Sequence, residues 1–71
     1  IMSKYDNRHG GPYDRGGADS YYRRGLRPHY FVGDTYRSEA VMEDNMTSEE
    51  IEAYLAGYDD NEKIGNYKDY G

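Results

Sequence analysis

The chain has 71 residues, no cysteine and a formal net charge of −5. This length allows one small domain with a limited core, and the lack of cysteine excludes a disulfide framework and a thiolate metal site. No apolar run approaches the roughly 20 residues that span a bilayer, and no secretory leader opens the sequence. We therefore expect a soluble protein of the reducing cytoplasm that makes no membrane contact.

The charges divide the chain into two halves. Residues 11–37 form a basic half rich in Tyr, Arg and Gly, and residues 38–71 form an acidic helical half with ten Asp or Glu against two Lys. This asymmetry indicates that the halves dock on each other or that each faces a different partner. We expect residues 1–10 to form an N-terminal tail and residues 11–71 to form a single small domain.

The basic half contains two short predicted elements. Residues 18–25, ADSYYRRG, are expected to form one or two helical turns with Asp19 or Ser20 as the N-cap and Gly25 as the stop. Residues 29–37, HYFVGDTYR, predict a small hairpin, because a Gly-Asp pair suits a two-residue type II′ turn between aromatic and β-branched flanks. A hairpin this small must pack against another element.

The acidic half predicts a dominant C-terminal helix over residues 47–64. Thr47 and Glu50 have the spacing of a capping box, and Gly65 supplies a stop. Apolar residues recur at i, i+3, i+4 and i+7 and form one stripe, which consists of Ile51, Tyr54, Leu55 and Tyr58. We expect the tyrosine-rich hairpin and the loops of the basic half to cover this stripe, which gives an α+β fold.

A glycine interrupts this predicted helix. Gly57 costs about 1 kcal/mol there relative to alanine. Such a cost predicts a packing notch at Gly57 and Tyr58, where another backbone or ring approaches closely. The alternative, that the glycine is merely tolerated, stays open at this point.

The sequence carries no pattern that indicates catalysis. His9 and His29 have no second imidazole or carboxylate at ligand spacing, and the acidic stretch from Asp59 lacks the Gly and Glu positions of a calcium loop. The serines lack a nucleophile-elbow context, and a chain this short has little room for a substrate pocket. We expect a non-enzymatic protein with no cofactor and no metal.

The stretch rich in Tyr and Arg is the predicted binding surface. Its candidate contact residues are Tyr13, Arg15, Tyr21, Tyr22, Arg23, Arg24 and Arg27. Protein interfaces favour Tyr and Arg, which indicates a protein partner. The same stretch is similar to RGG-type RNA-binding segments, in which Arg contacts phosphate and Tyr stacks on bases. Against RNA, the chain is acidic as a whole, and we expect Asp14 and Asp19 to pair with Arg15 and Arg23.

Residues 11–71 resemble small uncharacterised proteins of tailed bacteriophages and some enterobacteria. Two segments carry the resemblance, GPYDRGGADSYYRRGLRPHY and MTSEEIEAYLAGYDDNEKIGNYKDYG. It implies a phage-type accessory protein that binds a host or phage protein in the bacterial cytoplasm.

A second similarity, to ribosome modulation factors, implies an alternative function. It consists of an alanine, a Gly-Tyr pair and a later glycine, and of a Pro-Tyr pair followed by an aromatic residue and a glycine, with the two blocks in reversed order. The matching residues are Ala53, Gly57, Tyr58 and Gly65, and Pro12, Tyr13, Tyr22 and Gly25. This alternative is binding to RNA or the ribosome. The acidic helix allows a third function, an inhibitor that presents carboxylates to a basic nucleic-acid-binding site.

Overall fold

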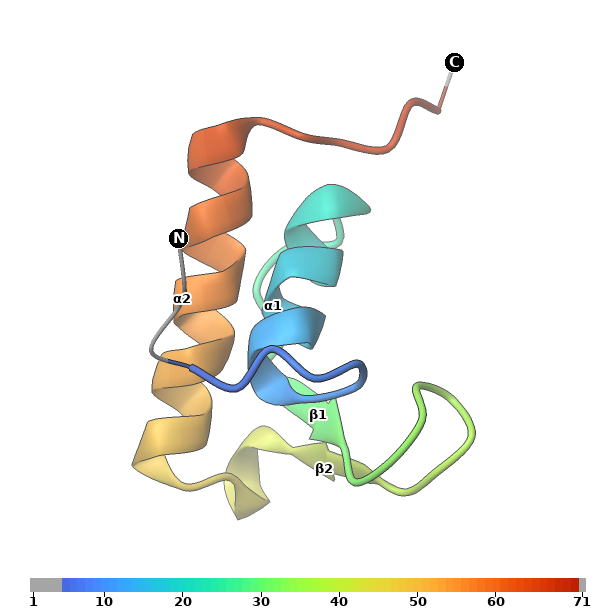
Figure 1. The fold of residues 1–71 in the computed structure, drawn as a ribbon, viewed down its shortest axis with the longest axis vertical. Helices are drawn as coiled ribbons and strands as arrows, with labels where there is room; N and C mark the ends of the chain where they lie inside the picture. The colour runs from blue at the N-terminus through green and yellow to red at the C-terminus, as the bar shows by residue number, and fades with distance from the viewer. Residues whose placement is uncertain (1–4, 71) are drawn as a thin grey trace.

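The structure is a computed structural model, and it describes residues 5–70. In chain order the elements are helix α1 (Pro12–Tyr21), strand β1 (His29–Phe31), strand β2 (Ala40–Met42), the 3-10 turn η1 (Glu43–Asn45) and helix α2 (Ser48–Ile64). The two helices lie side by side, and the antiparallel hairpin of β1 and β2 lies next to α1 (Figure 1). The prediction of one small α+β domain with a dominant C-terminal helix is confirmed.

Helix α2 forms where the sequence predicts it, because its local signals agree. The Thr47 hydroxyl accepts the Glu50 N–H at 3.1 Å, and the Glu50 carboxylate accepts the Thr47 N–H at 2.8 Å, so the capping box is complete. The helix ends before Gly65, which adopts the left-handed conformation at φ 73°. The predicted N-cap and stop are both confirmed.

Helix α1 begins earlier than the sequence predicts. Pro12 occupies its first turn, where a missing backbone N–H costs nothing because no intrahelical acceptor exists for it. Asp19 and Ser20 are therefore interior residues, and their predicted role as N-cap is wrong. The expected one or two turns over residues 18–25 are the second half of a ten-residue helix and its C-terminal turn.

The end of α1 is a Schellman-type turn built on an arginine. Arg23 has a positive φ of 59°, its N–H donates to the Ser20 carbonyl, and the Arg24 N–H donates to the Asp19 carbonyl. Glycine usually occupies this position because a side chain disfavours the left-handed conformation. The stop that the sequence placed at Gly25 therefore lies two residues earlier.

The hairpin joins more distant strands than the sequence predicts. Its partners across the ladder are His29 and Met42, Tyr30 and Val41, and Phe31 and Ala40. Residues 32–39 form the connection, so the predicted two-residue turn is wrong. The Ser38 hydroxyl closes this loop, because it accepts the Gly33 N–H at 2.8 Å and donates to the Asp34 carbonyl at 2.9 Å.

Glycines bring α1 and α2 into backbone contact. A Cβ atom on Gly16 would lie 1.9 Å from the carbonyl oxygen of Tyr54, and one on Gly57 would lie 2.0 Å from the carbonyl oxygen of Tyr13. Real Cβ contacts essentially never fall under 3.0 Å, so neither position accepts a side chain unless the helices separate. The predicted notch at Gly57 is confirmed, and the backbone of α1 fills it.

The buried face of α2 differs from the predicted stripe. Tyr54 is fully buried, with Ala53 and Gly57 buried on the same face, whereas Leu55 is 43% exposed. The expectation that Leu55 is covered is therefore wrong. Small residues let α1 approach the Ala53 and Gly57 side of α2, so α1, and not the hairpin, is its main partner. Ile51 and Tyr58 are half-buried at the margin of this face.

Part of the predicted N-terminal tail lies against the domain. The Phe31 N–H donates to the Gly10 carbonyl at 2.7 Å, and the Tyr5 hydroxyl donates to the Glu52 carboxylate at 2.5 Å. Gly10 is buried. Residues 5–10 thus run beside the hairpin and the helices, while the first four residues lie outside the described part of the chain.

We predict opposite effects for alanine at two adjacent glycines of α1. Gly16→Ala should destabilise the protein by about 1 to 3 kcal/mol, because its Cβ would collide with the backbone of α2. Gly17→Ala should be neutral or stabilise by up to about 1 kcal/mol, since its nearest contact, the Gly57 carbonyl oxygen, is 3.7 Å away and alanine favours helix. Denaturant unfolding measures both. Equal effects would contradict the backbone contact.

A second comparison separates helix capping from burial in α2. Thr47→Ala should cost about 0.5 to 2 kcal/mol, because it removes the hydroxyl that accepts the Glu50 N–H. Leu55→Ala should cost less than about 1 kcal/mol, since that side chain is nearly half exposed. Chemical denaturation checks both values. A loss of about 2 to 5 kcal/mol at Leu55, as expected of a buried leucine, would restore the predicted stripe.

Candidate functional site

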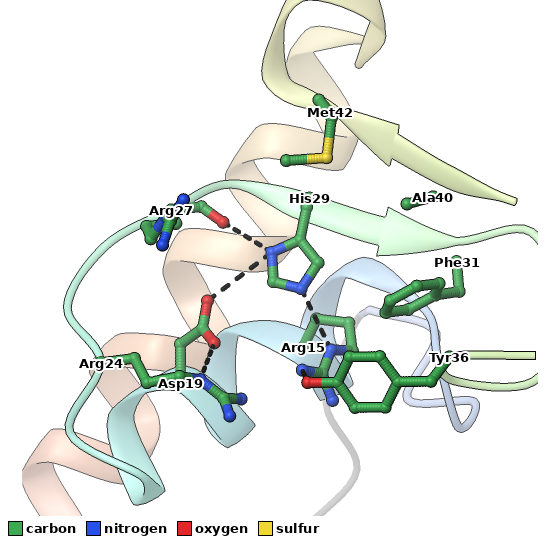
Figure 2. Close-up of a pocket in the computed structure, with 9 residues that line it drawn as sticks. All are labelled: Arg15, Asp19, Arg24, Arg27, His29, Phe31, Tyr36, Ala40 and Met42. Atoms are coloured by element: carbon green, nitrogen blue, oxygen red, sulfur yellow. Dashed lines mark hydrogen bonds and ion pairs between the residues drawn. The ribbon is translucent and has the colours of Figure 1, made fainter.

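A pocket of about 260 Å³ opens between α1, the hairpin and the segment that leads into β1 (Figure 2). Its lining consists of Arg15, Asp19, Arg24, Arg27, His29, Phe31, Tyr36, Ala40 and Met42. Three arginines face one aspartate, and four of the other residues are aromatic or apolar. The pocket therefore combines positive charge with an apolar wall.

Asp19 is the buried centre of the polar network below this pocket. Its carboxylate, with a side chain only 3% exposed, accepts hydrogen bonds from the Tyr54 hydroxyl and from Arg24 Nε, the latter at 3.0 Å. It also lies 3.6 Å from His29 Nδ1. A buried carboxylate requires such partners. The charge of Asp19 is thus compensated within the protein.

Tyr54 connects α2 to the pocket. Its hydroxyl donates to Asp19 and accepts the Arg27 N–H at 2.9 Å, although the whole residue is buried. Burial, together with the hydrogen bond to the Asp19 carboxylate, raises the pKa of Tyr54 well above its usual range. The hydroxyl therefore stays protonated at neutral pH and keeps its role as donor.

His29 orients the arginine beside it. Its Nδ1 lies 2.6 Å from the Arg27 carbonyl oxygen, and its Nε2 accepts a hydrogen bond from Arg15 Nε at 3.2 Å. The neutral tautomer with the proton on Nδ1 satisfies both contacts, because Nδ1–H donates to the carbonyl while Nε2 accepts. Both ring nitrogens are thereby engaged within the protein.

Arg15 is a buried cation that has no carboxylate partner within residues 5–70. The residue is 5% exposed, and its guanidinium donates to His29 Nε2 and, at 3.2 Å, to the Tyr36 hydroxyl. The guanidinium carbon lies 5.5 Å and 5.3 Å from the ring centroids of Phe31 and Tyr36. A guanidinium has five N–H donors, and these contacts use two. Spare donors on a desolvated arginine are typical of a carboxylate or phosphate site.

The charge pairs differ from those that the sequence predicts. Asp19 pairs with Arg24 and not with Arg23, because Arg23 lies beyond the last helical residue in the left-handed conformation. Asp14 accepts a backbone N–H of the preceding loop and does not pair with Arg15. Adjacent residues of a helix point in different directions, so they cannot face each other.

The structure brings together only part of the predicted Tyr/Arg surface. Arg15, Arg24 and Arg27 line the pocket, although Arg15 is buried rather than an exposed contact residue. Tyr22 joins them because the Arg24 guanidinium lies over its ring, 4.7 Å from the centroid. Tyr21 packs edge-on against the ring of Tyr22 at 4.9 Å.

The other two predicted contact residues, Arg23 and Tyr13, lie outside the pocket lining and make their contacts elsewhere. Arg23 stacks over the Tyr67 ring at 5.2 Å, in a separate depression. Tyr13 donates its hydroxyl hydrogen bond to Asp60 and thereby ties α1 to α2. These side chains contact parts of the fold outside the pocket.

The residues of the apolar wall were not among the predicted contact residues. The wall consists of Phe31, Tyr36, Ala40 and Met42. The aromatic flanks of the hairpin were a usable signal for Phe31. The same flanks included Tyr36, but nothing local indicated its positive φ of 62° or the position of its ring beside Arg15.

Comparison of the sequence with family models and curated proteins, and of the fold with solved structures, gave no match. Within residues 5–70, no helix has the length and apolar character needed to cross a membrane. The same part of the chain holds no group of three or more His, Cys, Asp or Glu side chains arranged for a metal ion.

We predict that Tyr54→Phe destabilises the protein by about 1 to 3 kcal/mol at neutral pH, because it leaves the buried Asp19 carboxylate short of a donor. The loss should shrink in alkali. The folded-state pKa of Tyr54 is raised, so its stabilisation is complete below about pH 10 and is lost as the pH rises toward the folded value. Unfolding at pH 8 and pH 11 tests this. A constant gap between parent and variant would contradict the raised pKa.

Proposed function

We propose that this is a non-enzymatic binding protein whose partner is another protein. The supporting observation is an exposed patch around the pocket, which we term the Arg/Tyr face. It consists of the exposed residues Tyr22, Arg24, Leu26, Arg27, Tyr36 and Met42, which surround the buried Arg15. Aromatic residues, Met and Arg are the side chains enriched in protein interfaces, and a clustered exposed apolar patch marks an interaction site.

The exposure of its large side chains supports this function. Tyr36 is 72% exposed, Leu26 56% and Met42 50%. Leu26 and Met42 line a second depression that shares Arg27 and Met42 with the pocket, so the patch is continuous. Exposed apolar area of this kind gains free energy when a partner removes it from water.

The state of the polar groups favours binding over catalysis. Asp19 and His29, the pocket residues most suited to proton transfer, hold hydrogen bonds within the protein. A general base needs a free acceptor within reach of its substrate. The groups that remain open are arginine donors and rings, which recognise a partner.

The proposed location and the proposed kind of partner rest on the resemblance of residues 11–71 to small phage and enterobacterial proteins. We place the protein in the cytoplasm of a bacterial host, where the partner is a host or phage protein. RNA or ribosome binding, and inhibition of a basic nucleic-acid-binding site through the acidic helix, are the competing functions. These functions differ from the proposed one in whether capture of a partner survives nuclease and in how steeply the affinity falls with salt.

The test is capture of partners from bacterial lysate with and without nuclease, followed by affinity measurement with the purified partner. We expect nuclease-resistant capture of a protein, and a loss of tenfold or more in affinity for Tyr22→Ala or Arg27→Ala. Arg27 suits this test because its side chain is exposed and makes no hydrogen bond or ion pair with the described residues, 5–70. Arg37→Ala, an exposed arginine outside the Arg/Tyr face, is the matched control and should change affinity by less than about twofold.

Nucleic-acid binding would give a different result. Capture would disappear with nuclease, and affinity for single-stranded RNA would fall with salt at a log-log slope near −0.7 per phosphate contacted. A partner whose affinity depends on the carboxylates of α2 and not on Tyr22 or Arg27 would support the inhibitor instead. Either outcome contradicts the proposed function.

A further inference from the structure

We propose that the pocket of the Arg/Tyr face binds a carboxylate attached to a small apolar group, such as the C-terminal carboxylate of an apolar residue. This inference rests on the proposed function, because the carboxylate would belong to the protein partner. In this proposal the Arg15 guanidinium binds the carboxylate. Figure 2 shows this guanidinium at the wall of the pocket, held between His29 and the Tyr36 hydroxyl.

The positive charge of the pocket that is not paired within the protein favours an anionic ligand. Arg24 is paired with Asp19 at 3.0 Å, and His29 is satisfied as a neutral ring. Arg15 and Arg27 thus remain without a carboxylate within the described part of the chain. Arg15 is also 5% exposed, so water compensates its charge poorly. An incoming carboxylate would be held by a charge-assisted hydrogen bond in a partly dry site.

The fixed position of Arg15 makes it a suitable anchor. Its Nε donor is occupied by His29 and one terminal nitrogen by Tyr36, while the two rings beside it restrict the guanidinium plane. Little side-chain entropy is then lost when a ligand binds. The remaining terminal donors match the planar geometry of a carboxylate.

The apolar wall limits what can accompany the anion. Phe31, Ala40 and Met42 line the same pocket as the arginines, and a hydrated inorganic anion would leave these apolar side chains uncovered. The volume, about 260 Å³, is just below the range of about 300 to 1,000 Å³ of small-molecule sites, so roughly one residue fits. The net charge of −5 opposes binding of a polyphosphate chain. These features together favour an apolar residue that ends in a carboxylate.

The direct test is an NMR titration of the folded chain with N-acetyl-leucine, and with N-acetyl-leucinamide as its neutral match. We expect N-acetyl-leucine to bind with a Kd on the order of 1 to 10 mM, as its size allows. Shifts should be largest at the backbone amides of β1 and β2, which carry the pocket wall. The neutral amide should bind at least about fivefold more weakly.

Two pairs of variants locate the carboxylate. Arg15→Gln should weaken N-acetyl-leucine at least tenfold, and Arg37→Gln, which removes the same charge from an exposed position outside the pocket, should change the Kd by less than about twofold. Met42 is half exposed at the rim, so its replacement is compatible with the fold. Met42→Glu should block binding by offering Arg15 an internal carboxylate, while Met42→Gln should retain most of it. If Arg15→Gln fails to fold, the two Met42 variants still test whether the pocket binds a carboxylate.

Three other outcomes overturn the inference. Equal binding of acid and amide would show an apolar pocket without a carboxylate site. Tighter binding of inorganic phosphate than of N-acetyl-leucine would show a phosphate site. Absence of binding at 20 mM N-acetyl-leucine would show that the pocket is not a carboxylate site. The existence of a protein partner is tested separately by capture. Probe binding without nuclease-resistant capture would instead contradict the proposed function and retain the carboxylate site.

Discussion

The close backbone contact of α1 with α2 at Gly16 and at Gly57 determines much of the rest of the structure. Because neither residue has a Cβ, the backbones of α1 and α2 approach each other directly, with Tyr54 and Tyr13 supplying the facing carbonyl groups. The chain has few aliphatic side chains with which to build a core. Close approach of two helices replaces part of that core, since it brings many atoms into van der Waals contact without large side chains.

Polar side chains stabilise this helix pair on both sides of the glycine contact. Ser20, which is fully buried, donates to Glu62 at 2.6 Å and accepts from Asn61 at 2.8 Å. Tyr54 reaches Asp19 from the opposite helix. Buried polar groups that are fully paired fix one arrangement of the chain, because any slip leaves a donor or acceptor without a partner. Tyrosine thus fills the volume that leucine would occupy and adds a directed hydrogen bond.

The same packing explains why an arginine can be buried in so small a domain. Tyr54 and Arg24 hold Asp19, and the segment that returns to β1 places His29 against Arg15. The basic half of the chain thereby docks on the acidic helix while some of its positive charge stays open at the pocket. A net acidic protein thus presents a local cationic site, and its position is set by the buried network rather than by surface side chains.

The sequence by itself determined the features that depend on neighbours a few residues away. The capping box of Thr47 and Glu50, the stop at Gly65 and the need for a notch at Gly57 all follow from local signals, because caps and propensities act within one or two turns. Only the tertiary structure decided which face of α2 is buried, since that depends on Gly16 in a distant helix, and Leu55 was misplaced for this reason.

The pocket also belongs to the tertiary structure. Arg15 could be recognised as a candidate from its type, but its burial depends on rings from the hairpin and from the 32–39 loop. That loop could not be predicted, because the ladder pairs strands on either side of eight residues and a Ser38 side chain closes it. Non-local pairing of this kind leaves no periodic trace in the sequence, so side chains such as Tyr36 meet Arg15 only once the chain has folded.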